Sequence, residues 1–261
     1  TSLFVAMLLL LSSCGSVPLT GRKQVLLVSD QEVLSSSLTQ YSDYMKSAKK
    51  SSSKDGAAMV TRVGKKIAAA TEQYLRNNGL ESEIKNFAWE FNLVNDPQVN
   101  AFCMPGGKIV VYEGLMQLVS SDDELAVVVG HEVAHAVAKH SNERMSQQLM
   151  AQYGAQILGQ ALSNKSAAVQ KIGASVYGLG AQYGVMLPFS RKHESEADYM
   201  GLVFMAMAGY NPAVAVNFWQ KMSAGQSGST PEFMSTHPSD ATRINEIKQH
   251  LPEIEKYRVK K

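Results

Sequence analysis

One short stretch of this 261-residue chain has the residue types and spacing of a metal site, His131-Glu132-Val133-Ala134-His135. On a helix, His131 and His135 lie one turn apart on the same face and present two imidazole nitrogens to one zinc ion. Glu132 lies beside that face, where a carboxylate can take a proton from zinc-bound water. The flanking residues are small or apolar, which favours a buried helix. The stretch therefore predicts a zinc-dependent hydrolase.

A hydrolytic zinc site has three protein ligands and leaves one position for water, so two histidines are not enough. In one class of zinc peptidases the third ligand is a histidine six residues after the second, and here that position is Ser141. His140, five residues after His135, lies on a different helix face and is expected at the surface. The third ligand must come from elsewhere in the chain.

A polar stretch from Ser190 to Asp198 supplies the better candidate. On a helix, Glu194 and Asp198 share a face, whereas Glu196 points away. A carboxylate ligand with a second carboxylate one turn later suits a pair in which Glu194 binds the metal and Asp198 orients a zinc-bound imidazole. The sequence thus predicts one zinc ion per chain.

The N-terminal end indicates secretion. Residues 1–11 are almost wholly apolar but too short for a membrane-spanning helix of roughly 20 residues. They lead into Leu11-Ser12-Ser13-Cys14, which predicts a signal peptide over residues 1–14, truncated at its start, with a bacterial lipobox and lipid on Cys14. The alternative is ordinary signal cleavage with an incidental cysteine. With Cys14 lipidated, Cys103 has no disulfide partner and is expected to be buried and inert.

The remaining pattern predicts an α+β, mainly helical fold with a small sheet beside the motif helix. Helix starts are expected at Ser29 and Ser121, and two apolar runs around Pro105-Gly106-Gly107 predict a β-hairpin. Residues 15–25 are expected to be a tether and residues 26–261 a single domain. The glycine-rich segment 154–184 is compatible with packed helices, a mobile lid or a membrane-contacting hairpin. The net charge of +2 and the lack of a basic stripe argue against a nucleic-acid partner.

The two motifs together resemble the gluzincin zinc metallopeptidases, the group of HtpX, the CAAX prenyl endopeptidases and the Oma-type proteases. Further similar segments are Asn100-Ala101-Phe102 and Ser235-Thr236-His237-Pro238, the latter with Arg243. The chain most resembles the bacterial lipoprotein branch of LoiP and BepA, without the helical-repeat domain. This resemblance implies a zincin-like fold.

The resemblance also implies roles for individual residues. His131, His135 and Glu194 are expected to hold zinc, with Glu132 as the general base and Asp198 behind the ligands. His237 is expected either to steady the oxyanion of the reaction or to cover the open zinc position in a latched, inactive state.

A substrate-binding strand is expected beside the site. Val110, Val111 and Tyr112 belong to a stretch that we expect to be an edge strand pairing with the substrate backbone. The alternative is a purely structural strand.

The expected function is hydrolysis of peptide bonds in misfolded or misassembled envelope proteins. The expected location is the periplasmic face of the outer membrane, through the lipid anchor at Cys14. The rival interpretation is a latched, chaperone-like envelope assembly factor with little proteolytic activity.

Overall fold

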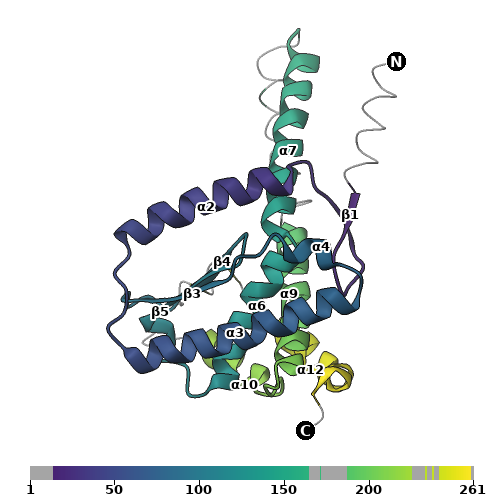
Figure 1. Cartoon of the computed structure of the whole chain (residues 1–261). Helices are drawn as coiled ribbons and strands as arrows, with labels where there is room; N and C mark the ends of the chain where they lie inside the picture. The colour runs from purple at the N-terminus through teal and green to yellow at the C-terminus, as the bar shows by residue number, and fades with distance from the viewer. Residues whose placement is uncertain are drawn as a thin grey trace.

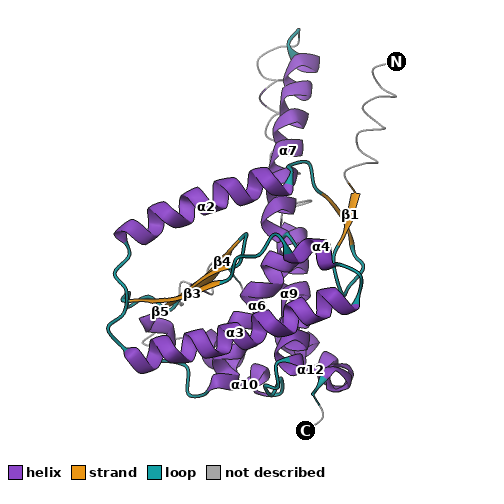
Figure 2. Ribbon diagram, viewed as in Figure 1, coloured by secondary structure: helices purple, strands orange, loops and turns teal. Residues whose placement is uncertain are grey.

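The computed structural model describes residues 14–164, 171, 187–224, 233, 237 and 241–259. Within them the fold is mainly helical with two small sheets, which confirms the predicted α+β class (Figures 1 and 2). Residues 1–13 of the expected signal peptide 1–14, and residues 165–170 and 172–184 of the glycine-rich segment 154–184, lie outside the described residues. The elements in chain order are β1 (Cys14–Ser16), β2 (Lys23–Val25), α2 (Asp30–Ser47), α3 (Lys54–Asn77), α4 (Glu81–Ile84), β3 (Glu90–Val94), β4 (Ala101–Met104), β5 (Lys108–Tyr112), α5 (Glu113–Met116), α6 (Asp122–Val137), α7 (His140–Leu162), α9 (Leu187–Met207), α10 (Val214–Ala224), α12 (Ala241–Ile254) and the 3-10 turn η2 (Glu255–Tyr257).

The three-stranded sheet has the order β3-β5-β4, with β5 parallel to β3 and antiparallel to β4. A tight turn joins β4 to β5, and both Gly106 and Gly107 have positive φ angles there, of 95° and 81°. Glycine adopts that backbone region without steric cost, which explains the turn sequence. The predicted hairpin is therefore confirmed.

Strand β5 is the central strand of this sheet and is covered on both faces. Ile109 and Val111 face the main core, which includes residues of α3 and α6, whereas Val110 and Tyr112 pack with Tyr41 of α2 on the opposite face. Its backbone is paired on both sides. The expectation that Val110, Val111 and Tyr112 form an edge strand for substrate is therefore wrong, because a central strand has no free hydrogen-bonding edge. The sheet edge next to α6 is β4.

Helices α6 and α9 cross at the centre of the molecule (Figure 1). The crossing is close because glycines meet there: a Cβ on Gly130 would lie 2.8 Å from the carbonyl oxygen of Gly201, and a Cβ on Gly201 would lie 2.7 Å from the backbone nitrogen of His131. Helix α6 begins at the predicted cap, where the Ser121 side chain accepts from the Glu124 N–H. The α6–α9 crossing brings the polar stretch of α9 next to the His131–His135 motif of α6.

The segment expected to be a tether, residues 15–25, is packed onto the domain. Strand β1 pairs with β2, Val17 is buried in the main core, and the Arg22 side chain is only 10% exposed. Val17 contributes apolar burial, and Arg22 binds two buried carboxylates. These contacts hold the segment in place, although its Gly- and Pro-containing sequence does not predict them.

Helix α7 extends away from the rest of the described chain (Figure 1). Its outer part exposes large apolar side chains, with Tyr153 at 60% and Ile157 at 67%. In the part of the chain that the structure describes, no helix combines the length and apolar character needed to cross a bilayer.

Candidate metal centre

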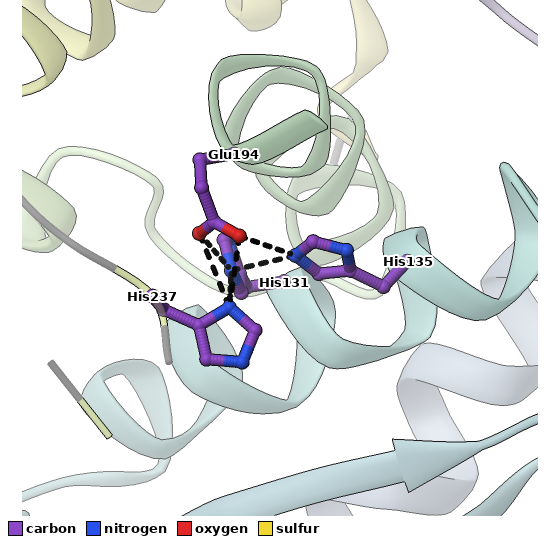
Figure 3. Close-up of side chains that lie close together, drawn as sticks. All are labelled: His131, His135, Glu194 and His237. Carbon is purple, nitrogen blue, oxygen red and sulfur yellow. Dashed lines mark hydrogen bonds and ion pairs between the residues drawn. The ribbon is translucent and has the colours of Figure 1, made fainter. Parts of the chain in front are cut away.

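Four side chains from three segments converge beside the α6–α9 crossing (Figure 3). His131 and His135 come from α6 and Glu194 from α9, and His237 reaches the same point from the segment before α12. One ligand atom from each lies within 4.8 Å of all the others. The structure therefore brings together the three predicted ligands and adds His237 to them.

The spacing of these atoms fits a tetrahedral zinc ion. The two Nε2 atoms of His131 and His135 are 3.1 Å apart, and they lie 3.2 and 3.4 Å from the Glu194 carboxylate oxygens. The Nδ1 atom of His237 lies 3.0 Å from the Glu194 carboxylate and 3.3 Å from His131 Nε2. Ligands about 2.0–2.1 Å from a tetrahedral zinc lie roughly 3.3 Å from one another. One ion can therefore bind all four side chains.

Electrostatics at this point also favours a cation. Burial alone would raise the pKa of Glu194, but hydrogen bonds from the three surrounding histidines outweigh burial and hold its pKa far below the ordinary range. Burial opposes protonation of His131, yet hydrogen bonds with Asp198 and Glu194 raise its pKa to about 9. Glu194 is thus held as an anion among the histidines, as a carboxylate ligand of a metal must be.

Glu132 lies next to the cluster with one oxygen unengaged. Its Oε2 accepts a 3.1 Å hydrogen bond from the Cys103 N–H of β4. Its Oε1 is buried without a hydrogen-bond partner among the described residues, and His237 Nε2 lies 3.5 Å away. Burial raises the pKa of this carboxyl. A buried, unpartnered carboxylate oxygen beside a set of metal ligands is placed to bind a water or a proton.

Behind His131 lies a buried chain of contacts that we call the Arg243 arm, formed by His131, Asp198 and Arg243. The Asp198 Oδ1 atom is 3.0 Å from His131 Nδ1, as the predicted role of Asp198 requires. Arg243 of α12 holds both Asp198 oxygens, with its Nε on Oδ2 and a 2.9 Å bond to Oδ1. The carboxylate therefore has a fixed orientation, and it fixes the imidazole in turn.

Arg243 also reaches the rest of the cluster. One of its terminal nitrogens lies 3.2 Å from Glu194 and donates to the backbone carbonyl of His237 at 3.2 Å. From the sequence, Arg243 belongs to a segment similar to the gluzincin group and has no expected role of its own. Its spacing from the other site residues carries no local pattern that would have revealed one.

The prediction that His140 lies at the surface is wrong, because the helix does not continue through it. Helix α6 ends at Val137, and Lys139 has the left-handed angles φ 57° and ψ 33°. The chain changes direction there, so His140 opens α7 and turns back toward the site. It is 2% exposed, and its Nδ1 lies 2.9 Å from Nδ1 of His135.

Behind His135 lies a second chain of contacts, which we call the Arg22 arm: His135, His140, Glu196 and Arg22. The Nε2 atom of His140 is 3.0 Å from Glu196 Oε2. Arg22 donates from its Nε to the same Glu196 oxygen at 2.8 Å. Glu196 does point away from the metal ligands, as predicted, but into this buried network rather than into solvent.

Arg22 bridges a second carboxylate on α7. Its two terminal nitrogens donate to Glu143 at 2.8 and 2.7 Å, and Glu143 also lies 3.0 Å from Nε2 of His193. The exposed fractions of the Glu143 and Glu196 side chains are 3% and 5%. No local sequence pattern predicts these contacts.

Cys103 is half-buried and has no disulfide partner among the described residues. Burial raises the pKa of its thiol, so the group is protonated at neutral pH. Its contact with the site is made by its backbone N–H rather than its sulfur.

Comparison with known proteins agrees with this geometry. The model of peptidase family M48 matches residues 61–251, which include all four members of the cluster. The mitochondrial metalloendopeptidase OMA1 of Schizosaccharomyces pombe is 36% identical over 205 residues, 75% of this chain and 53% of that protein. OMA1 of Arabidopsis thaliana is 40% identical over 168 residues, 64% of this chain and 33% of that protein.

A bacterial relative matches as well. The beta-barrel assembly-enhancing protease of Yersinia pestis is 34% identical over 175 residues, 62% of this chain and 36% of that protein. The chain thus spans only about a third to a half of the length of these relatives. The resemblance to the gluzincin group found from the sequence is confirmed, and the chain belongs to peptidase family M48.

Proposed function

We propose that this chain is a zinc-dependent metalloendopeptidase, with His131, His135 and Glu194 as zinc ligands and Glu132 as general base. The observation that carries the proposal is the convergence of the ligand atoms within 4.8 Å, beside the unpartnered Oε1 of Glu132. The relatives named as metalloendopeptidases support the same activity.

The chain's own groups are arranged for acid–base work on a peptide bond. Zinc bound here would lower the pKa of a water ligand toward ~7 and polarise the scissile carbonyl. Glu132 accepts the water proton at Oε1, while the Cys103 N–H holds Oε2 in place. Its raised pKa brings the carboxyl nearer to neutral pH, where a base both takes up and returns a proton efficiently. As Glu132 takes this proton, the water oxygen adds to the carbonyl carbon. Glu132 then donates the proton to the amine nitrogen as the C–N bond breaks.

His237 has two expected roles, and its position supports one of them. Its Nδ1 lies with the ligand atoms, in the place that a hydrolytic site leaves to water. This favours a covering ligand over an oxyanion donor, so the side chain must leave before water can bind. The same observation favours the second candidate function, an assembly factor whose latched site rarely cuts.

A His237→Ala variant separates these roles. As a covering ligand, His237 slows cleavage, and its removal raises the rate on an unfolded protein substrate. As an oxyanion donor, its removal lowers the rate by about 10²–10³-fold. Cleavage should be measured on preparations with equal zinc content.

The substrate class and the location are part of the proposal. The apolar stretch 1–11 and Cys14 support secretion and lipid anchoring in a bacterial envelope, at the periplasmic face of the outer membrane. The relative named as a beta-barrel assembly-enhancing protease supports misfolded or misassembled envelope proteins as substrates.

The decisive variant is Glu132→Gln, which keeps an oxygen for the Cys103 N–H but removes the base. We expect unchanged zinc content and a loss of cleavage of about 10²–10⁴-fold on an unfolded protein. Full cleavage by this variant contradicts the proposed mechanism. Complementation of a deletion strain by Glu132→Gln favours the assembly factor, and a requirement for Glu132 in cells excludes it.

A further inference from the structure

The two metal-binding histidines are supported differently. A zinc-bound histidine usually donates its second ring N–H to a carboxylate or carbonyl, which fixes its tautomer and orientation. For His131 this partner is Asp198. For His135 the partner is another imidazole, that of His140, at 2.9 Å.

The contacts of His140 determine where its proton lies. With Nε2 of His135 among the ligand atoms, its Nδ1 carries the hydrogen and donates to His140 Nδ1. His140 then carries its own hydrogen on Nε2 and donates it to Glu196 at 3.0 Å. Glu196 is therefore needed as an acceptor for His140 to accept from His135.

Glu196 in turn is held from the N-terminal segment. Arg22 donates to its Oε2, and the Thr20 hydroxyl donates to its Oε1. Arg22 is fixed at its other end by the two-pronged contact with Glu143 of α7. The Arg22 side chain is only 10% exposed, so its contacts are shielded from competing water.

We propose that Arg22 and Glu196 are positioning residues that orient the zinc ligand His135 through His140, which makes the segment before β2 a part of the metal site. The segment that follows Cys14 thereby contributes to zinc affinity and is not a passive spacer. The inference rests on the zinc site proposed above.

The chain offers a matched pair of variants. Glu196 and Glu143 are both buried carboxylates, and each bonds to Arg22 and to one histidine. The histidine bound to Glu196 contacts the zinc ligand His135, whereas the histidine bound to Glu143 is His193. Glu196→Ala should weaken zinc binding by about 10–100-fold in competition with a chelator. Glu143→Ala should weaken zinc binding less than Glu196→Ala does, because it removes one support of Arg22 but leaves the His135–His140–Glu196 contacts in place.

A second cycle tests whether Arg22 acts through His140. Arg22→Ala should weaken zinc binding in the wild-type background and have no further effect in a His140→Ala background, because the route to His135 is already broken. The d–d spectrum of the cobalt-substituted protein should shift more in Arg22→Ala and Glu196→Ala than in Glu143→Ala. Folding of each variant is checked by circular dichroism, and the Gln variants replace any Ala variant that does not fold.

Zinc affinity and the cobalt spectrum separate this inference from the proposed function. A wild-type protein that binds no zinc contradicts the proposed function and with it the inference. Unchanged zinc affinity in Glu196→Ala, or a loss of zinc affinity in Glu143→Ala equal to that in Glu196→Ala, overturns the inference but leaves the proposed function in place. Additive losses in Arg22→Ala and His140→Ala overturn it as well.

Discussion

The Arg243 arm and the Arg22 arm end alike, in a buried arginine on a buried carboxylate, but they differ in construction. In the Arg243 arm the carboxylate of Asp198 contacts the ligand His131 directly. In the Arg22 arm an imidazole stands between the ligand and the carboxylate. The Arg243 arm lies wholly within the residues matched by the family model, 61–251, whereas Arg22 lies before them. One arm thus belongs to the matched peptidase region, and the other joins that region to the N-terminal segment.

Helix α9 is common to both arms. Asp198 and Glu196 lie two residues apart, so they project on different sides of the helix and each serves a different histidine. Glu194 on the same helix joins the ligand cluster itself. The close α6–α9 crossing therefore sets the geometry of both arms at once.

The largest effect is expected from breaking the Arg243 arm with Asp198→Ala. This leaves Arg243 buried beside His131 without its main partner, and losing one member of a buried ion pair costs about 3–5 kcal/mol of unfolding free energy. Zinc affinity should also fall by about 10–100-fold. Denaturant unfolding and chelator competition measure the two effects.

The control for that variant is Asp122→Ala. Asp122 also makes a two-pronged contact with an arginine, Arg62, but that arginine side chain is 50% exposed. We expect a change within about 1 kcal/mol. Equal losses of unfolding free energy in the two variants would mean that burial does not increase the contribution of the Asp198–Arg243 pair to stability.

A smaller effect is expected from separating the helices with Gly201→Ala. The new Cβ meets the His131 backbone nitrogen at 2.7 Å, and backbone cannot move aside as a flexible side chain does. We expect a loss of about 1–3 kcal/mol in unfolding free energy, together with weaker zinc binding, since both arms depend on the crossing.

Gly159→Ala serves as its control. Gly159 is also helical, in α7, but a Cβ there has no neighbour within 4 Å. Alanine should be neutral or stabilise by up to about 1 kcal/mol. Normal zinc affinity and stability in Gly201→Ala would show that the glycine contact does not position the site.

The smallest effect is a pH dependence in the network of Arg22. Burial alone would raise the pKa of Glu143, but hydrogen bonds with His193 and Arg22 lower it from 4.5 to about 2. A lowered carboxyl pKa contributes stability that is complete above about pH 4.5 and is lost as the pH falls toward 2. The difference in Tm between wild type and Glu143→Gln should therefore be largest above pH 5 and shrink toward pH 3. A difference that grows on acidification contradicts this assignment.

The ligands His131, His135 and Glu194, and Asp198 of the Arg243 arm, could be predicted from the sequence because they form local pairs, whereas Arg243 itself could not. His131 and His135 are four residues apart, as are Glu194 and Asp198, and helical periodicity places each pair on one face. The hairpin and the first helix cap were likewise predictable from adjacent residues, and both are confirmed.

The Arg22 arm could not be predicted in this way. Arg22 and Glu196 are 174 residues apart, and a single buried ion pair over that separation leaves no periodic pattern. His140 was misplaced because the left-handed turn at Lys139 redirects the chain, and lysine is not a residue that marks such turns.

The residues of β5 partly indicate its central position in the sheet. Ile109, Val110 and Val111 form a continuous apolar run rather than an alternating one, which is typical of a strand buried on both faces. That apolar run favours a central strand over an edge strand.

The most direct test of the central claim is X-ray absorption at the zinc edge on purified protein, with Glu194→Ala measured alongside the wild type. The site described here predicts one zinc per chain with nitrogen and oxygen ligands at about 2.0–2.2 Å and no sulfur. Glu194→Ala should lose one oxygen ligand and bind zinc more weakly. Absence of zinc from the wild type, a sulfur ligand, or an unchanged spectrum in Glu194→Ala would contradict a metal centre built on His131, His135 and Glu194.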